Sequence, residues 1–408
     1  MELLSPAGSF ESLQAAIDNG ANAVYFGVEQ LNMRARASNN FTVEDIDEIA
    51  QRAKSKHVRT YLTLNTVMYD HDIQLAKLIL QRAKDAGITA VIASDHAILH
   101  FAHKIGLPVH LSTQANCSNF ETVLFYSAYC DAIVLARELS LRQVAEIVRQ
   151  IRKEQVIGPS GKLIKIEIFG HGALCMAISG KCYLSLHSHN ASANRGACIQ
   201  NCRHTYTVKD KEEDIELEID NEYIMSAKDL CTIDFLDQIV EAGVSILKIE
   251  GRGRSADYVA TTATCYQQAL KAIAENTYNA DFVHQLKEKL STVYNRGFWD
   301  GYYLGKKIGE WATTPGSIAT RKKIYIGKGL KYFDRIQVAE FQMESGTLDV
   351  GDEILITGPS TGVIETTVTE LRVADVDHIS VKKGDLISLP LPQKIRLGDK
   401  LYKVLTTQ

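Results

Sequence analysis

The sequence predicts a (β/α)₈ barrel with a long cysteine-rich insertion, followed by a small β-barrel at the carboxyl end. Three observations support this fold. Eight short apolar runs alternate with amphipathic segments over about 275 residues, one connection is unusually long, and after Pro315 short alternating strands replace the helical pattern. We expect a barrel domain at 1–315, with the insertion at about 170–225, and a β domain at 316–408.

The expected strands are the most apolar and β-branched runs of the first domain. They are Met1 to Leu4, Ala23 to Phe26, Thr60 to Leu64, Ala90 to Ala93, Val109 to Leu111, Ala132 to Leu135, Ile164 to Phe169 and Ser245 to Ile249. Between them, apolar residues recur at i, i+3, i+4 and i+7, the spacing of an amphipathic helix. One such helix is expected from Asp229 to Glu241. A doubly wound sheet is the competing architecture, but no glycine-rich fingerprint follows a strand.

Composition indicates a folded, water-soluble protein. The 408 residues are 45% hydrophobic and 23% charged, and the net charge is -4. No apolar run approaches the roughly 20 residues that span a bilayer, so we expect no membrane partner and a cytoplasmic location. The small net charge neither requires nor excludes nucleic acid, because an acidic protein can carry a local basic face.

Cysteines cluster in the long connection. Five of the eight lie close together in sequence, namely Cys175, Cys182, Cys198, Cys202 and Cys231. Stable disulfides are uncommon in a reducing compartment, which favours a metal or redox site. The spacing has no C-x₂-C pair, so a structural zinc site is not indicated, whereas single cysteines on a long loop can converge on an iron-sulfur cluster. A redox dithiol and plain buried thiols are the alternatives.

The stretch EIFGHGALCMAISGKCYLS at 167–185 is similar to the signature of the collagenase-like peptidase U32 family, E-x-F-x-x-G-[SA]-[LIVM]-C-x₄-G-x-C-x-[LIVM]-S. The phrases NRGACIQNCR, SAKDLC, LKIEGR and YNRGFWDGYYLG also resemble that family. One departure is GRGRS at 251–255, where relatives often have a lysine in place of the second arginine.

The resemblance implies an activity that the family name does not suggest. Its well-understood members are oxygen-independent hydroxylation proteins with a 4Fe-4S cluster. Carried over residue by residue, the ligands are Cys175, Cys182, Cys198 and Cys231, which leaves Cys202 as a spare neighbour. A single barrel with a short β module resembles the members that form 5-hydroxyuridine at the tRNA wobble position with prephenate as hydroxyl donor. The expected partners are tRNA and, as a candidate, an electron-donor protein.

Candidate site residues follow from the barrel, since active sites on this fold use the loops after the strands. Glu167 and His171 are the candidate catalytic residues, and His171 either moves a proton or fixes the loop. The candidate substrate-binding residues are Arg34, Arg36, Asn65, Gln114, Arg137, Glu138, Arg195, Glu250 and Arg252. The arginines suit an acidic donor, and the amides suit a base or a carboxylate. Arginine–glutamate pairs on the rim and packing of the barrel mouth are the alternative explanations.

Two other functions stay open. A thiol peptidase would need a cysteine beside a histidine, for which Cys175 and His171 are candidates, while no H-E-x-x-H metal motif occurs. A non-catalytic RNA-binding scaffold would use basic residues of the β domain. Those residues are Arg321, Lys322, Lys323, Lys328 and Lys331.

Overall fold

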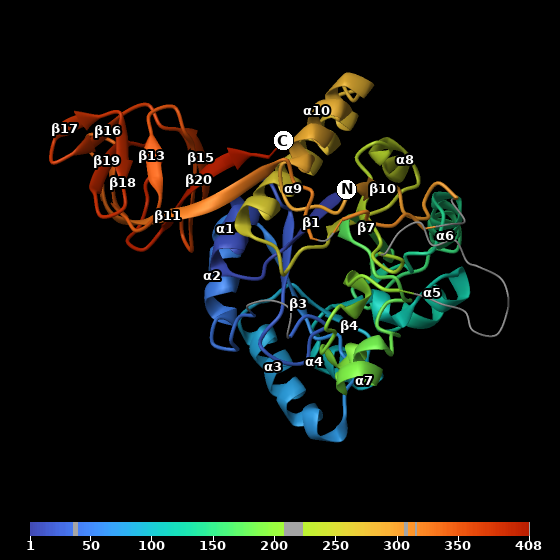
Figure 1. The fold of residues 1–408 in the computed structure, drawn as a ribbon. Coiled ribbons are helices and arrows are strands. Elements are labelled where there is room, and N and C mark those ends of the chain that lie inside the picture. The colour runs from blue at the N-terminus through green and yellow to red at the C-terminus, as the bar shows by residue number, and fades with distance from the viewer. Residues whose placement is uncertain (36–39, 208–222, 306–308, 315, 408) are drawn as a thin grey trace.

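The computed structural model describes residues 1–35, 40–207, 223–305, 309–314 and 316–407. Within these ranges, eight parallel strands close into a barrel (Figure 1). The strands are β1 (Glu2–Pro6), β2 (Ala23–Phe26), β3 (Arg59–Thr63), β4 (Ala90–Ala93), β5 (Val109–Leu111), β6 (Ala132–Val134), β7 (Lys165–Ala173) and β9 (Ile246–Ile249). Strand β9 pairs in parallel with both β7 and β1, which closes the ring. The predicted barrel is confirmed, and each expected strand overlaps one observed strand.

Helices surround the barrel because their apolar faces need cover from water. They are α1 (Phe10–Asp18), α2 (Ile46–Ser55), α3 (Ile73–Asp85), α4 (His96–Ile105), α5 (Phe120–Tyr126), α6 (Leu141–Lys153), α8 (Leu236–Glu241), α9 (Ala256–Ala274) and α10 (Ala280–Ser291). Helix α6 illustrates the local causes. Ser140 caps it by accepting a hydrogen bond from the amide of Gln143, and its buried residues follow the helical period. None of the helices in the described ranges is both long and apolar enough to cross a membrane.

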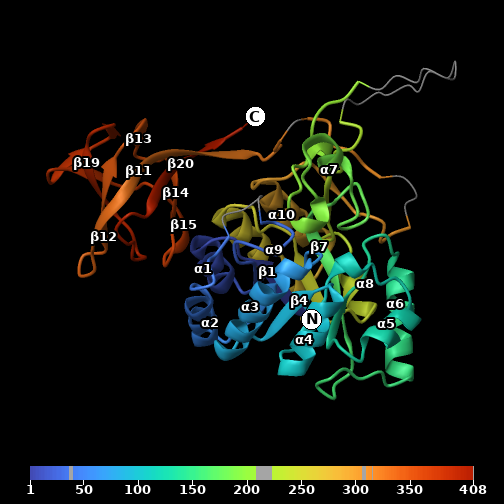
Figure 2. The ribbon, with the colours of Figure 1, turned by 90° about the horizontal axis from the view of Figure 1, so that it is seen from below.

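The insertion after β7 contains α7 (Leu184–His189), which lies beyond one end of the barrel (Figure 2). The chain then returns as β8 (Asp229–Cys231), antiparallel to the last residues of β7, and β10 (Phe298–Trp299) pairs beside β8. The helix expected from Asp229 to Glu241 is present with the predicted end, but its predicted start is wrong. Residues Asp229–Cys231 form β8 because β7 is nine residues long and its end offers a free edge with which they pair. Helix α8 starts only at Leu236. Most of the acidic stretch after Tyr206 lies outside the described residues.

The carboxyl-terminal domain is a small β domain, as predicted. Its antiparallel sheet contains β15 (Gly362–Thr367), β14 (Glu353–Gly358), β20 (Lys400–Thr406), β11 (Arg321–Phe333), β12 (Val338–Met343), β19 (Leu386–Pro390), β16 (Leu371–Val373) and β17 (Val376–His378) in that order. A ribbon of β13 (Thr347–Asp349) and β18 (Ser380–Lys382) accompanies it. The domain has its own apolar core and lies beside α1, away from α7 (Figures 1 and 2). The end of the barrel near α7 is therefore covered by the insertion and not by the carboxyl-terminal domain (Figure 2).

Candidate functional site

A cavity of about 400 Å³ lies at the carboxyl ends of the barrel strands. One part of its lining follows the strands, and the other part comes from the insertion. The strand-end residues include Tyr25, Thr63, Asn65, Ser112, Gln114, Arg137, Phe169, Lys248, Glu250 and Arg252. The insertion contributes residues between Ala173 and Arg203. The cavity therefore lies where active sites of this fold are found.

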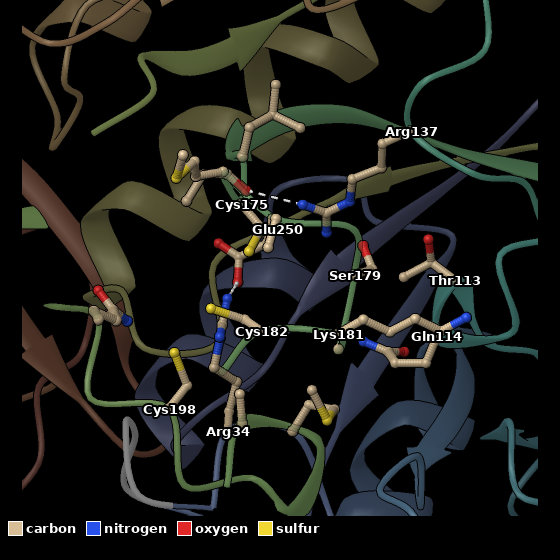
Figure 3. A pocket seen from close by; sticks show the side chains of 18 of the residues that line it. Arg34, Thr113, Gln114, Arg137, Cys175, Ser179, Lys181, Cys182, Cys198 and Glu250 are labelled. Carbon is tan, nitrogen blue, oxygen red and sulfur yellow. Dashed lines mark hydrogen bonds and ion pairs between the residues drawn. The ribbon is translucent and has the colours of Figure 1, made fainter. Parts of the chain in front are cut away.

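Glu250 and Arg34 form an ion pair inside this cavity. The Arg34 Nη2 atom lies 3.1 Å from Glu250 Oε1, and Figure 3 shows the pair among the labelled cysteines. Burial opposes ionisation of Glu250, but Arg34, Arg254 and Arg137 outweigh it and hold the pKa of the carboxyl below its ordinary value. Glu250 is therefore an anion at neutral pH.

Arg137 points into the cavity with part of its guanidinium unsatisfied (Figure 3). Its Nη1 atom donates to the carbonyl of Ala173 at 3.3 Å, and the guanidinium lies 3.9 Å from the ring centre of Phe169. The Nε atom is buried and has no hydrogen-bond partner among the residues that the structure describes. Burial lowers the pKa of Arg137, although Glu250 opposes this shift. The Arg137 side chain lines the cavity, so its guanidinium presents a positive charge that suits an acidic ligand.

Arg252 is a second buried cation, and the hydrogen-bond acceptors that contact it are neutral. Its Nη1 atom donates at 2.9 Å both to Asn32 Oδ1 and to Thr63 Oγ1. Burial lowers its pKa to about 10, so the side chain stays charged at neutral pH. Arg137 and Arg252 thus bring positive charge to one cavity.

The floor of the cavity contains a buried triad, which we define as His110, Glu167 and Lys248. Lys248 Nζ donates to Glu167 Oε1 at 2.8 Å, and His110 Nδ1 lies 3.1 Å from Glu167 Oε2. Burial opposes ionisation of Glu167, but Lys248 and His110 lower its pKa to about 2. Glu167 is fully buried and does not line the cavity, whereas Lys248 does. Glu167 therefore affects the cavity by positioning Lys248 through their ion pair.

Two amides form a polar edge of the cavity. Asn65 Nδ2 donates to Ser112 Oγ and to Gln114 Oε1, both at 3.3 Å, and Asn65 Oδ1 accepts from the amide of Met33 at 3.1 Å. Gln114 also accepts from Ser112. The structure therefore brings Asn65 and Gln114 together on the lining, as expected of a site that contacts a polar ligand.

Four cysteines line the cavity, and we call them the pocket thiols: Cys175, Cys182, Cys198 and Cys202. Figure 3 shows the first three around the Arg34–Glu250 pair. Burial raises the pKa of Cys202, Arg203 opposes this shift, and the other three pocket thiols add to it. Within the described ranges, no group of three or more histidine, cysteine or acidic side chains is already arranged around a metal ion. The donor set suits a four-thiolate cluster, but the thiols would have to draw together to bind it.

Cys231 lies apart from the cavity lining. It is buried in β8, where its backbone pairs with His171 and its sulfur lies 3.9 Å from the hydroxyl of Tyr266. Burial raises its pKa to about 11, which favours the protonated thiol. Its predicted role as a ligand stays a prediction, and Cys202 occupies the lining instead.

His171 is buried among aromatic side chains. Its Nδ1 atom lies 3.3 Å from the hydroxyl of Tyr266, and its ring contacts Tyr258 and Phe298. Burial, with Arg254 nearby, lowers its pKa to about 3, so the imidazole is neutral at physiological pH. His171 is not part of the cavity lining, and this placement favours the role of fixing the loop.

Arg195 and Glu138 lie outside the cavity lining. Arg195 pairs with Asp72 and lies 4.1 Å from the ring centre of Tyr69, so it joins the insertion to the loop after β3. Glu138 is exposed, and Arg36 falls outside the described residues. Arg195 therefore matches the alternative explanation, an arginine–carboxylate pair on the rim.

Sequence reasoning missed Lys248 and Arg203. Arg203 donates to the carbonyls of Leu174 and Ala227 at 2.7 and 2.6 Å, which ties both ends of the insertion together. Lys248 could have been found, because a lysine in the middle of the apolar strand ILKI needs a buried partner. Arg203 had no comparable local signal.

Comparison with known proteins places this site in a family. The profile of peptidase family U32 matches residues 8–313, which include the cavity. The chain belongs to peptidase family U32. A protein of Porphyromonas gingivalis named collagenase is 54% identical over 402 residues, covering 98% of this chain and 97% of that protein. The U32 relatives thus include one named for peptidase activity.

Other U32 relatives are named for RNA modification. The tRNA hydroxylation protein P1 of Bacillus subtilis is 32% identical over 416 residues, covering 98% of this chain and 93% of that protein. The tRNA hydroxylation protein P of Escherichia coli is 29% identical over 449 residues, covering 97% and 95%. Both kinds of name therefore occur among relatives that span nearly the whole chain.

Proposed function

We propose that this protein hydroxylates a uridine of tRNA, forming 5-hydroxyuridine at the wobble position with the help of a 4Fe-4S cluster. The observation that carries the proposal is the convergence of four thiols and two buried arginines on one cavity at the mouth of the barrel. Relatives named tRNA hydroxylation proteins support it. The reaction would take place in the cytoplasm, with tRNA as the macromolecular partner and an electron-donor protein as a candidate second partner.

The pocket thiols would hold the cluster. A 4Fe-4S cluster takes one thiolate per iron, and four cysteines are available on the lining. Such a cluster supplies one-electron redox chemistry when bound. Arg34 and Glu250 lie beside these thiols, so they would orient a ligand that enters next to the cluster.

Arg137 and Arg252 would bind an acidic hydroxyl donor, for which prephenate is the candidate. Charge-assisted hydrogen bonds from guanidinium groups to carboxylates are among the stronger polar contacts in proteins. Both arginines line the cavity, and the acceptors that they contact are neutral oxygens, so neither positive charge is balanced by a hydrogen-bonded carboxylate of any described residue. Asn65 and Gln114 would bind the uracil edge, since amides pair with the edges of unstacked bases.

The first test is nucleoside mass spectrometry of tRNA from a deletion strain. We expect loss of 5-hydroxyuridine, recovery with the intact gene and no recovery with Cys175→Ser. Anaerobically purified protein should contain iron and absorb near about 400 nm, where thiolate-ligated clusters absorb. Unchanged nucleosides would contradict the hydroxylation, and the absence of iron would contradict the cluster.

Peptidase activity is the second candidate, favoured by the 54% identical relative named collagenase. A thiol peptidase pairs its cysteine with a histidine. In the described part of the chain, no histidine forms a hydrogen bond with a pocket thiol, and His171 is held by Tyr266 instead. Cleavage of labelled gelatin that is lost in Cys175→Ser, with unchanged tRNA nucleosides, would establish the peptidase.

The scaffold function has less support, because three of its five basic residues are already paired. Arg321 pairs with Glu353, Lys323 with Asp257 and Lys328 with Glu344. These pairs neutralise the charge that phosphate binding would need.

A further inference from the structure

The segment 168–207, which we call the rim segment, contains no aspartate or glutamate. At the average of the chain, 49 acidic residues in 408, its 40 residues would contain about five. Its exposed basic side chains are Lys181, His187, His189 and His204, whereas Arg195 pairs with Asp72. A surface with this composition favours an anionic partner over a cationic one.

Tyr183 is the most exposed aromatic residue of the rim segment. Its side chain is 77% exposed, although the residue lines the cavity. Among the described residues, no hydrogen bond or ring contact holds its side chain. Met176 and Ile178 are also about half exposed beside the cavity. Exposed apolar groups at the edge of a cavity are typical of a binding surface.

We infer that Tyr183 stacks against the nucleotide next to the one in the cavity, so that the rim segment binds single-stranded RNA. This inference rests on the proposed function. A cavity of about 400 Å³ is at the small end of ligand sites, which suits one base, so the neighbouring bases must stay outside. Aromatic side chains bind such bases through their flat faces, and Lys181 would contact the backbone.

The test measures binding of a fluorescent uridine-containing octanucleotide by anisotropy. Stacking contributes about 1–3 kcal/mol per base, so Tyr183→Ala should weaken binding by about 5-fold to 150-fold. Tyr183→Trp should bind nearly as well as the unchanged protein, because it keeps an aromatic face. Phe125→Ala is the matched control, since Phe125 is exposed on α5 outside the lining, and it should bind normally.

Equal binding by Tyr183→Ala, or an equal loss in Phe125→Ala, would overturn the inference. Loss of gelatin-peptide binding in Tyr183→Ala, with RNA binding unchanged, would overturn it in favour of a peptide partner. The assay does not depend on hydroxylation. Tyr183-dependent RNA binding together with unchanged tRNA nucleosides would therefore leave the rim inference standing and contradict the proposed function.

Discussion

The floor of the cavity, formed by the buried triad, differs from its wall, the part of the insertion that carries the pocket thiols. The two regions differ in whether their polar side chains have hydrogen-bond partners. On the floor, the members of the buried triad contact one another at 2.8 and 3.1 Å. On the wall, no hydrogen bond to a pocket thiol is found in the described ranges. The floor should therefore hold its geometry without a ligand, whereas the positions of the pocket thiols should depend on one. This difference suits a rigid barrel that presents a cluster on an inserted segment.

The largest expected effect is on the wall, where exchanging one thiol should abolish cluster binding. Cys202→Ser should lose nearly all iron, because Cys202 lines the cavity, whereas Cys231→Ser should retain it. Iron per chain is measured after anaerobic purification. The reverse outcome would restore the ligand set predicted from the sequence and show that the wall rearranges when it binds the cluster.

Lys248→Met tests the floor. It removes the lysine cation from the buried Glu167 carboxylate and leaves His110 as its partner in the triad. Removal of one partner from a buried ion pair costs about 3–5 kcal/mol. Urea unfolding at pH 7 measures this loss. Lys181→Met is the control at an exposed position and should change the free energy of unfolding by less than about 0.5 kcal/mol. A small effect of Lys248→Met would show that the floor is not the more rigid region.

The strands were predictable, because each is a buried apolar run between amphipathic segments. Strand β8 was not, because its three residues take their conformation from pairing with the end of β7. The pairing of Arg195 with Asp72 joins residues 123 positions apart, for which no local pattern exists. The cysteine cluster was visible in the sequence, but the burial of Cys231 depends on tertiary packing.

Glu167 should make the stability of the protein depend on pH. Its pKa falls from 4.5 to about 2 on folding, so its contribution to stability is present above pH 4.5 and is lost as pH falls towards 2. At about 1.4 kcal/mol per unit, the contribution is on the order of 3 kcal/mol. The difference in unfolding free energy between the unchanged protein and Glu167→Gln should therefore shrink between pH 5 and pH 3. A difference that stays constant with pH would contradict the lowered pKa of Glu167 in the folded protein.

The most local effect is expected at Arg203, which holds the two ends of the insertion together. Arg203→Met removes its hydrogen bonds to the carbonyls of Leu174 and Ala227, and each such loss costs about 1–3 kcal/mol locally. Hydrogen exchange should accelerate around Leu174, while β9 on the floor keeps its protection. Arg82→Met, which breaks an exposed pair with Asp47, should change neither region. Equal acceleration of exchange in β9 would mean that the insertion and the barrel unfold locally together. Loss of a contact in the insertion would then also destabilise the barrel strands.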